Sequence, residues 1–379
     1  MANAFTALGL MSGTSMDGID IALIETDGER IFRHGPARTV PYPAAFRERL
    51  SHGLSEALTI RAAGDRPGSL ADLERELTLR HAEVVNAYCR DFGLSPAAVD
   101  VVGFHGQTVL HRPHQRLTVQ LGDGALLAAA TGIPVVNDFR SADVLAGGQG
   151  APLAPVYHRA LAATAGPEAP LAFLNLGGVG NVTYIGVDGD LIAFDTGPGN
   201  ALIDDWLLRH TGTACDVDGR EASQGIVRED ILAILLDNPY FSRPAPKSLD
   251  RNDFSSDAIE GLSLADGAAT LTAFTAASVV RALDHLPAAP RRWIVCGGGR
   301  HNPAMMRALA ERLTGEVLAA EALAIDGDSI EAEAFAFMAV RTMRGLPISF
   351  PGTTGAPEPM SGGVLHRLAD QPRAAGAAE

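Results

Sequence analysis

Lysine is almost absent from this chain of 379 residues. Its 30 basic residues include one lysine, Lys247, and all the others are arginine. A P-loop needs a lysine that follows glycine and precedes serine or threonine, whereas Lys247 follows Pro246. The sequence therefore excludes the nucleotide-binding proteins that rely on that motif.

Cysteine and long apolar runs are also scarce. Cys89, Cys215 and Cys296 lie far apart and match no metal-ligand spacing, which is typical of a protein in a reducing compartment. No apolar stretch reaches the length of a membrane span, and the first residues lack the basic region of a signal peptide. We therefore expect a cytoplasmic protein with no membrane partner.

Positive charge is outnumbered by negative charge. The chain has 45 acidic residues, a formal net charge of -15 and a pI near 5.1. This balance argues against nucleic acid or an anionic membrane as the main partner. An anionic small molecule would have to be bound by individual arginines, and the chain length favours two domains.

The stretch from Leu171 to Arg209 contains the densest set of chemical signals. Three short apolar strands are predicted there, and the first ends in the glycine turn Gly177–Asn181. The third ends at Asp195, before Thr196–Asn200. Glycines allow backbone N–H groups to converge on an anion, so these turns favour a phosphate-binding site.

Asp195 is the candidate catalytic carboxylate. A helix is predicted from Ala201, with Asn200 as its N-cap, and the positive end of its dipole would favour an ionised Asp195 that accepts a proton. The alternative is that Asp195 only caps a turn.

A second strand–turn–strand pattern lies at the start of the chain. Strands are predicted at residues 6–10 and 19–25, and the turn between them offers hydroxyls and the glycines Gly13 and Gly18. Asp17 is a candidate ligand for Mg²⁺, which takes one or two carboxylates together with phosphate oxygens. A polar β-turn without a ligand is the alternative.

Polar residues follow the apolar strands at residues 99–104 and 133–136. Open α/β sheets bind ligands at the ends of their strands, so these residues form a candidate substrate wall. Arg140, before the glycine-rich residues 147–150, is the best candidate for pairing with a carboxylate. The candidate wall consists of His105, Gln107, Thr108, Asp138 and Arg140.

The second half of the chain adds three candidates, each with an alternative. Gly297–Gly299, between a predicted strand and helix, would admit a ring or sugar–phosphate close to the backbone, or would form a tight turn. Glu331, on a predicted helix at residues 329–343, would point into a cleft or lie on the surface. Lys247, in a polar loop, would be solvated or would close on a ligand.

The order of these loops resembles the sugar kinase/heat-shock protein/actin superfamily, and within it the family of anhydro-N-acetylmuramic acid kinases. The similarity runs from about Gly9 to Gly355. The motifs that carry it are GLMSGTSMDGID from Gly9, FHGQTVLHRP from Phe104, DFRSADVLAGGQGAPLAP from Asp138, NLGGVGNVTYI from Asn175, FDTGPGNALIDDW from Phe194, PKS from Pro246 and VCGGGRHNP from Val295.

The resemblance implies an α/β fold of two ribonuclease-H-like domains, with mixed sheets flanked by helices and a nucleotide cleft between them. We expect an N-terminal domain at residues 1–166 and a C-terminal domain at residues 167–346. Residues 347–379 would form a surface tail that returns toward the N-terminal domain and ends in disorder.

The resemblance also implies the reaction. ATP would phosphorylate O6 of 1,6-anhydro-N-acetylmuramic acid while water opens the anhydro ring, giving N-acetylmuramic acid 6-phosphate for cell-wall recycling. Asp195 would be the general base, and the partners would be ATP, Mg²⁺ near Asp17, the sugar and, in a homodimer, a second copy.

The resemblance assigns the remaining positions to two ligands. ATP would contact Ser12, Gly13, Thr14, Ser15, Met16, Asp17, Gly18, Ile19, Gly177, Gly178, Asn181, Gly297, Gly298 and Gly299. The sugar would contact His105, Gly106, Gln107, Thr108, Arg140, Gly148, Gln149, Gly199, Asn200 and Glu331.

One departure from the family pattern concerns the lactyl carboxylate of the sugar. Many relatives continue the DFR motif with further arginines, whereas Ser141 and Ala142 follow it here. The carboxylate contact then falls on Arg140 or on a residue not yet identified. Two alternatives stay open: a conventional hexosamine 6-kinase, and a nucleotide-dependent binding or scaffold protein without sugar chemistry.

Overall fold

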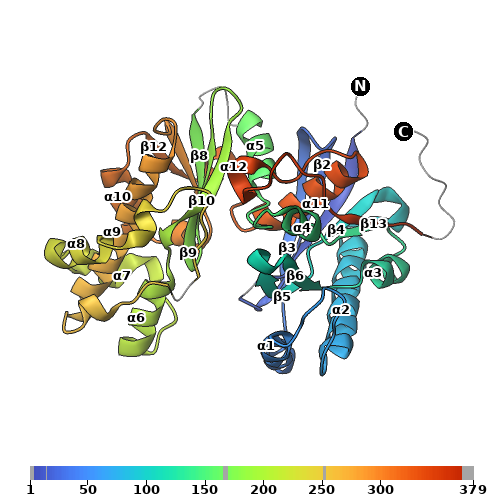
Figure 1. Ribbon diagram of the computed structural model, residues 1–379, viewed down its shortest axis with the longest axis horizontal. Coiled ribbons are helices and arrows are strands. Elements are labelled where there is room, and N and C mark those ends of the chain that lie inside the picture. The colour runs from blue at the N-terminus through green and yellow to red at the C-terminus, as the bar shows by residue number, and fades with distance from the viewer. Residues whose placement is uncertain (1–3, 14, 165–169, 251–252, 369–379) are drawn as a thin grey trace. The chain divides into compact units, whose positions relative to one another are not determined.

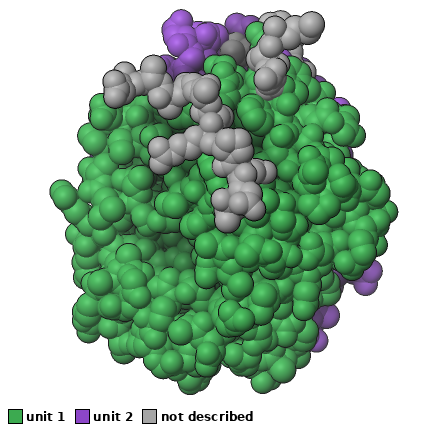
Figure 2. Space-filling view, turned by 90° about the vertical axis from the view of Figure 1, so that its right-hand side faces the viewer, with its two compact units in different colours: residues 1–160, 329–379 green, residues 161–328 purple. Residues whose placement is uncertain are grey.

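The computed structural model describes residues 4–13, 15–164, 170–250 and 253–368, and the chain divides into two compact units (Figure 1). Unit 1 comprises residues 1–160 and 329–379, and unit 2 comprises residues 161–328; Figure 2 colours the surface by unit. The boundary expected at residue 166 lies outside the described residues, as does the tail end predicted to be disordered.

Unit 1 is built on a mixed sheet of six strands in the order β13-β7-β4-β1-β2-β3. Strands β1, β2 and β3 are antiparallel neighbours, whereas β4 and β7 run parallel to β1. A separate ladder joins β5 and β6. The strands of unit 1 are β1 (Phe5–Met11), β2 (Gly18–Thr26), β3 (Ile31–Pro41), β4 (Val101–Phe104), β5 (Gln107–Arg112), β6 (Leu117–Leu121), β7 (Val135–Asn137) and β13 (Val364–His366).

Helices cover both faces of this sheet. Leu8 and Leu10 of β1 share a buried core with Leu73 and Leu77 of α2, because alternate residues of a strand face the same side. The opposite face packs against α11, which contacts β1, β2 and β4. The helices are α1 (Ala44–Ala57), α2 (Leu70–Asp91), α3 (Gly124–Thr131), α4 (Ser141–Ala146), α5 (Pro155–Thr164, which crosses the unit boundary), α11 (Ile330–Met343) and α12 (Pro351–Thr354).

Two glycines allow α11 to lie against the sheet. A Cβ on Gly9 of β1 would stand 1.8 Å from the carbonyl oxygen of Ala332, and one on Gly103 of β4 would stand 2.0 Å from that of Phe335. The helix backbone therefore occupies the space that side chains would need. This contact places residues 329–346 in unit 1, so their expected assignment to the second domain was wrong.

Unit 2 repeats the strand pattern of unit 1. Its sheet has the order β10-β9-β8-β11-β12, with β8, β9 and β10 antiparallel and β11 and β12 parallel to β8. Its core gathers around the buried helix α9 and Trp293. The elements are β8 (Leu171–Leu176), β9 (Val179–Ile185), β10 (Leu191–Pro198), α6 (Ala201–Thr211), α7 (Arg220–Gln224), α8 (Glu229–Leu236), α9 (Leu264–Ala282), β11 (Arg292–Cys296), α10 (Pro303–Arg312) and β12 (Glu316–Ala319).

Three antiparallel strands followed by two parallel ones, with helices on the faces, occur in both units. The expected α/β fold with mixed sheets flanked by helices is thus confirmed. Strand β3 was not predicted, because its alternating residues are mostly polar and exposed. The nucleotide cleft stays a prediction. None of the helices in the described part of the chain is long and apolar enough to cross a membrane.

We predict that Gly9→Ala will lower the free energy of unfolding by about 1–3 kcal/mol, because α11 must move away from the sheet. The urea concentration at the midpoint of unfolding will fall accordingly. Circular dichroism would follow the transition. Gly64→Ala is the matched control, since Gly64 is exposed and an added Cβ would meet nothing within 4 Å. Equal midpoints for the two variants would contradict the packing argument.

Candidate functional site

Hydrogen bonds between buried side chains fix the turn between β1 and β2. Ser12, only 1% exposed, donates its hydroxyl to Oε1 of Gln107 at 2.7 Å, and its Oγ lies 2.8 Å from the Tyr42 hydroxyl. Nε2 of Gln107 donates to the carbonyl of Gly13 at 3.1 Å. Both of these predicted ligand residues therefore fix the shape of the turn.

The rest of this turn divides into exposed and packed residues. Ser15 and Asp17 are exposed and joined by a 2.8 Å hydrogen bond, and Met16 adopts a left-handed φ of 53°. Gly18 and Ile19 belong to β2: a Cβ on Gly18 would lie 2.5 Å from the Val40 oxygen, and Ile19 is a core side chain. Thr14 lies outside the described residues.

The buried His105 and the half-buried Arg140 form a polar pair at the ends of β4 and β7. Nε2 of His105 accepts from Nε and Nη2 of Arg140 at 3.1 and 3.0 Å, and Nδ1 lies 2.8 Å from the Gly106 carbonyl. Burial and the Arg140 charge hold the pKa of His105 well below its usual value, so the imidazole is neutral. Burial lowers the pKa of Arg140 to about 10, which leaves it charged at neutral pH.

Arg140 also connects this pair to the glycine-rich loop at residues 147–150. Its Nη1 donates to the Gly150 carbonyl at 2.6 Å. A guanidinium has five N–H donors, and the contacts to His105 and Gly150 use three of them. Glu331, exposed in the first turn of α11, is close enough to stabilise the charge on Arg140 electrostatically.

The Asp143 carboxylate holds the same loop in place through hydrogen bonds. This role was not predicted from the sequence. The carboxylate is 2% exposed and accepts hydrogen bonds from Gly150 N at 2.6 Å, Ser349 Oγ at 2.5 Å and Thr354 Oγ1 at 2.6 Å. A Cβ on Gly148 would stand 2.2 Å from its Oδ1. Gln149 N donates to the Thr354 carbonyl at 2.6 Å. Residues from the tail segment thus shape a loop that lies 200 positions earlier.

A cavity of about 170 Å³ adjoins the His105 pair. Its lining includes His105 and Asp138 from the predicted wall together with Ser141, Arg66 and Gln120. Gln120 donates to Thr108 at 3.2 Å. Arg66 is already paired with Glu74 through two 2.8 Å hydrogen bonds, so it offers little additional charge.

In unit 2 the predicted glycine turns meet at the ends of β8 and β11. The carbonyls of Gly177 and Gly178 accept from the N–H groups of Gly199, Asn200 and Ala201. Asn200 is the N-cap residue of α6, as predicted, but its side-chain amide donates to the Leu176 carbonyl at 2.9 Å and makes no capping hydrogen bond. A Cβ on Gly177, Gly178 or Gly298 would make ordinary van der Waals contact, at 3.7 Å or more, without a clash.

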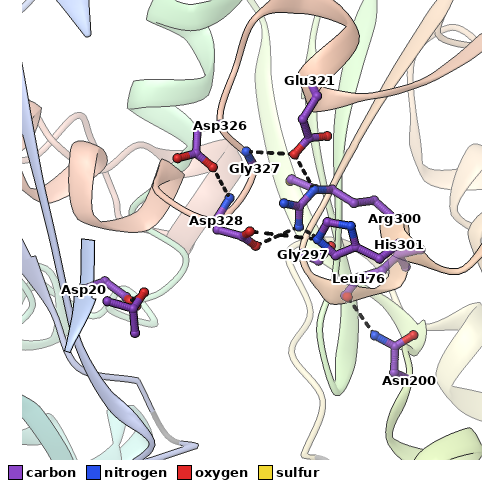
Figure 3. A network of polar contacts seen from close by, with 12 residues as sticks. Asp20, Leu176, Asn200, Gly297, Arg300, His301, Glu321, Asp326, Gly327 and Asp328 are labelled. Carbon is purple, nitrogen blue, oxygen red and sulfur yellow. Dashed lines mark hydrogen bonds and ion pairs between the residues drawn. The ribbon is translucent and has the colours of Figure 1, made fainter. Parts of the chain in front are cut away.

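Arg300 ties the triple-glycine turn to the segment that follows β12 (Figure 3). Its Nη1 donates to Gly297 O and to Asp328 Oδ1, each at 2.9 Å, and its Nε donates to Glu321 at 2.7 Å. The guanidinium is almost fully buried, so these partners fix its position. Gly297 itself has a φ of 74° and lies against Asn175.

Asp195 stands opposite Asn181 across the β9–β10 ladder, beside the glycine turn at residues 177–181. Its Oδ2 accepts from Leu249 N at 2.8 Å. Burial raises the pKa of Asp195 to about 6, and the Leu249 hydrogen bond only partly offsets this. The expected stabilisation of the carboxylate by the start of α6 is therefore not the dominant effect.

The loop that carries Lys247 encloses Asp195. Asp195 N donates to the Lys247 carbonyl at 3.0 Å, and the Tyr240 hydroxyl donates to the Asp195 carbonyl at 2.6 Å. The Lys247 ammonium is half-buried against its own loop, so it is neither solvated nor extended toward a ligand as either alternative assumed.

Among the described residues, no cluster of three or more His, Cys, Asp or Glu side chains could hold a metal. Asp17 is a single exposed carboxylate. Such a group fits Mg²⁺ that keeps its waters and takes other ligands from phosphate, but not a cation held by protein alone.

Comparison with known proteins identifies the family. The sequence profile of the family described as anhydro-N-acetylmuramic acid kinase matches residues 5–367. This chain belongs to the anhydro-N-acetylmuramic acid kinase family. A protein of that name from Rhodospirillum rubrum is 58% identical over 363 residues, covering 95% of this chain and 94% of the relative. Kinases of the same name from Rhizorhabdus wittichii and Paramagnetospirillum magneticum are 56% and 55% identical, covering 95% of this chain and 98% and 99% of their own lengths.

Within this kinase fold, the predicted residues form one group in each unit. Unit 1 brings together the β1–β2 turn, His105, Gln107, Arg140 and the loop at residues 147–150. Unit 2 brings together Asp195, Asn181 and the two glycine turns. Asp143, Tyr42 and Tyr240 were not predicted, because no local motif shows which distant loop a side chain will contact.

We predict that Asp143→Asn will destabilise unit 1 by about 1–3 kcal/mol, because buried donors lose a charged acceptor. Amide hydrogen exchange at Gly150 should accelerate, and urea unfolding gives the stability. Asp100→Asn is the control, since that exposed carboxylate accepts a 2.8 Å hydrogen bond from Thr6 N far from the loop. Unchanged exchange at Gly150 in the Asp143 variant would refute the role of Asp143 in the loop.

Proposed function

We propose that this chain transfers the γ-phosphoryl group of ATP to O6 of 1,6-anhydro-N-acetylmuramic acid while water opens the anhydro bridge. Family membership across residues 5–367 supports the sugar and the phosphoryl transfer. Asp195 supports the hydrolytic part, because it is a partly buried carboxylate with a raised pKa, positioned beside a glycine turn.

The proposed chemistry gives Asp195 one task. It accepts a proton from a water molecule whose oxygen bonds to the anomeric carbon, and the bond between that carbon and O6 breaks. O6 keeps the electron pair and bonds to the γ-phosphorus, and ADP leaves. One water and one phosphoryl group enter the sugar, and Asp195 returns its proton to solvent.

The burial of Asp195 suits this task. A base is most effective when its pKa lies just below the working pH, because it is then ionised and still basic. With a pKa of about 6, roughly ten carboxylates are ionised for each protonated one at pH 7. The Leu249 N–H and the backbone contacts to Lys247 and Tyr240 hold the carboxylate in place.

The glycine turns with Asp17 would bind ATP, and Arg140 would bind the sugar. The glycine turns at residues 177–178 and 297–299 would let backbone N–H groups approach a phosphate chain, and Mg²⁺ bound by Asp17 through water would offset phosphate charge. The Arg140 guanidinium has two N–H donors besides the three that contact His105 and Gly150, which fits a contact to the lactyl carboxylate.

The product distinguishes this reaction from its alternatives. We expect mass spectrometry to show a sugar that has gained one phosphoryl group and one water, with one ADP per product. A conventional hexosamine 6-kinase would add only a phosphoryl group and would accept N-acetylglucosamine. ADP release that does not depend on any sugar would contradict the proposal and favour a nucleotide-driven binding protein.

We predict that Asp195→Asn will lower kcat by about 10²–10⁴-fold with little change in the Kd for ATP, since it removes only the base. In the unmodified enzyme, kcat/KM should fall about tenfold per pH unit below pH 6, because protonation abolishes a base whose pKa is raised. Stopped assays of ADP release across pH 5–8 measure kcat and kcat/KM, and calorimetric titration measures the Kd for ATP. Asp188→Asn, in the exposed β9–β10 turn, is the control. Full activity in the Asp195 variant would assign the base elsewhere.

A further inference from the structure

The only lysine of the chain points its charge into its own loop. The Nζ of Lys247 lies 3.2 Å from the carbonyl oxygen of Tyr240 and 3.1 Å from that of Phe241. It lies 3.0 Å from Nε2 of His285, in the short helical turn at Leu283–His285 after α9. The ammonium also stands 4.7 Å from the centre of the Tyr240 ring.

These contacts match the donors of an ammonium group. Lys247 has three N–H donors and no acceptor, so it donates to the carbonyls of Tyr240 and Phe241. Nε2 of His285 lies 3.0 Å from Nζ and 2.8 Å from the Phe241 carbonyl oxygen, so it accepts from Lys247 in one tautomer and donates to Phe241 in the other. One side chain thus joins residues 240–241, residue 247 and the end of α9.

The backbone beside Lys247 holds the proposed base. The Lys247 carbonyl accepts from Asp195 N at 3.0 Å, and two residues later Leu249 N donates to the Asp195 carboxylate at 2.8 Å. Tyr240, whose carbonyl Lys247 binds, donates its hydroxyl to the Asp195 carbonyl. These three hydrogen bonds of Asp195 therefore all involve Lys247 itself, a residue near it in the chain or one of its contacts.

We propose that Lys247 is a positioning residue for the reaction: its ammonium fastens the loop at residues 240–249 so that Leu249 and Tyr240 hold Asp195 in place. This inference rests on the proposed role of Asp195. Lysine suits the position because a compact ammonium on a flexible stem can donate to two backbone carbonyls while it contacts His285 and the Tyr240 ring.

The charged and titratable groups around these side chains are few. Arg243 and Asp284 act on Lys247 electrostatically in opposite directions, and His285 contacts it directly. Tyr240 faces Asp195. Burial lowers the pKa of Lys247 to about 8, so the ammonium is mostly charged at pH 7.

The test compares Lys247→Met with Lys247→Arg. Methionine keeps the apolar stem and removes the donors, so Leu249 should move away from Asp195 and the pKa of Asp195 should rise further. We expect the acid limb of the kcat/KM profile to move up by about one pH unit, which lowers kcat/KM at pH 6 by about fivefold. The KM for ATP should stay within about twofold. Arginine, which retains donors, should restore part of the activity.

Arg243→Met is the matched control. Its guanidinium stands 5.6 Å from the centre of the same Tyr240 ring, so the variant removes a neighbouring cation without removing the loop anchor. We expect its acid limb to stay in place. An acid limb that moves equally in both variants would show a general charge effect and overturn the positioning role.

A measurement without turnover separates this inference from the proposed function. With ¹³C-labelled aspartate, and Asp195→Asn to assign the signal, the titration of Asp195 can be followed directly by NMR. We expect a higher midpoint in Lys247→Met than in the unmodified protein, with folding checked by circular dichroism. An unchanged midpoint in a folded variant would refute the inference, whereas inactivity of the unmodified protein toward the anhydro sugar would refute only the proposed function.

Discussion

Backbone groups in a glycine-rich loop need hydrogen-bond partners from elsewhere, because glycine brings no side chain that can pack the loop into place. In this protein a buried polar side chain supplies such partners in three of these loops. Gln107 holds the β1–β2 turn, Asp143 holds the loop at residues 147–150, and Arg300 holds the turn at Gly297. The turn at residues 177–178 is instead held by the backbone N–H groups of residues 199–201.

These anchors are buried, which makes them rigid and sensitive to loss. A buried polar group that keeps its hydrogen-bond partners lowers the stability of the fold very little. If it loses them, the full free energy of removing it from water is no longer offset. Asp143 uses its carboxylate on three donors, and Arg300 uses its guanidinium on three acceptors. Such saturation suits loops that must keep one shape before any ligand arrives.

Burial also sets the protonation of the groups proposed to act on substrate. It keeps His105 neutral beside a charged Arg140, and it raises the pKa of Asp195 toward neutrality. The same physical effect therefore has two results. The neutral His105 imidazole accepts hydrogen bonds from Arg140, whereas the Asp195 carboxylate becomes more basic and can accept a proton. The chain that carries this arrangement belongs to a family of sugar kinases. The backbone of Lys247 contributes a further contact, because its carbonyl accepts a hydrogen bond from Asp195 N.

The sequence alone determined the strands that end in polar turns, the α/β class and the candidate residues at those strand ends, because apolar periodicity and glycine are local signals. Only the tertiary structure decided that α11 returns to unit 1, since a backbone contact at Gly9 has no signature in the residues beside it. The exposed polar strand β3 and the distant partners of Asp143 and Lys247 were equally hidden. The direction of the Asp195 pKa shift also depended on burial, which is a property of the packed chain and not of any segment within it.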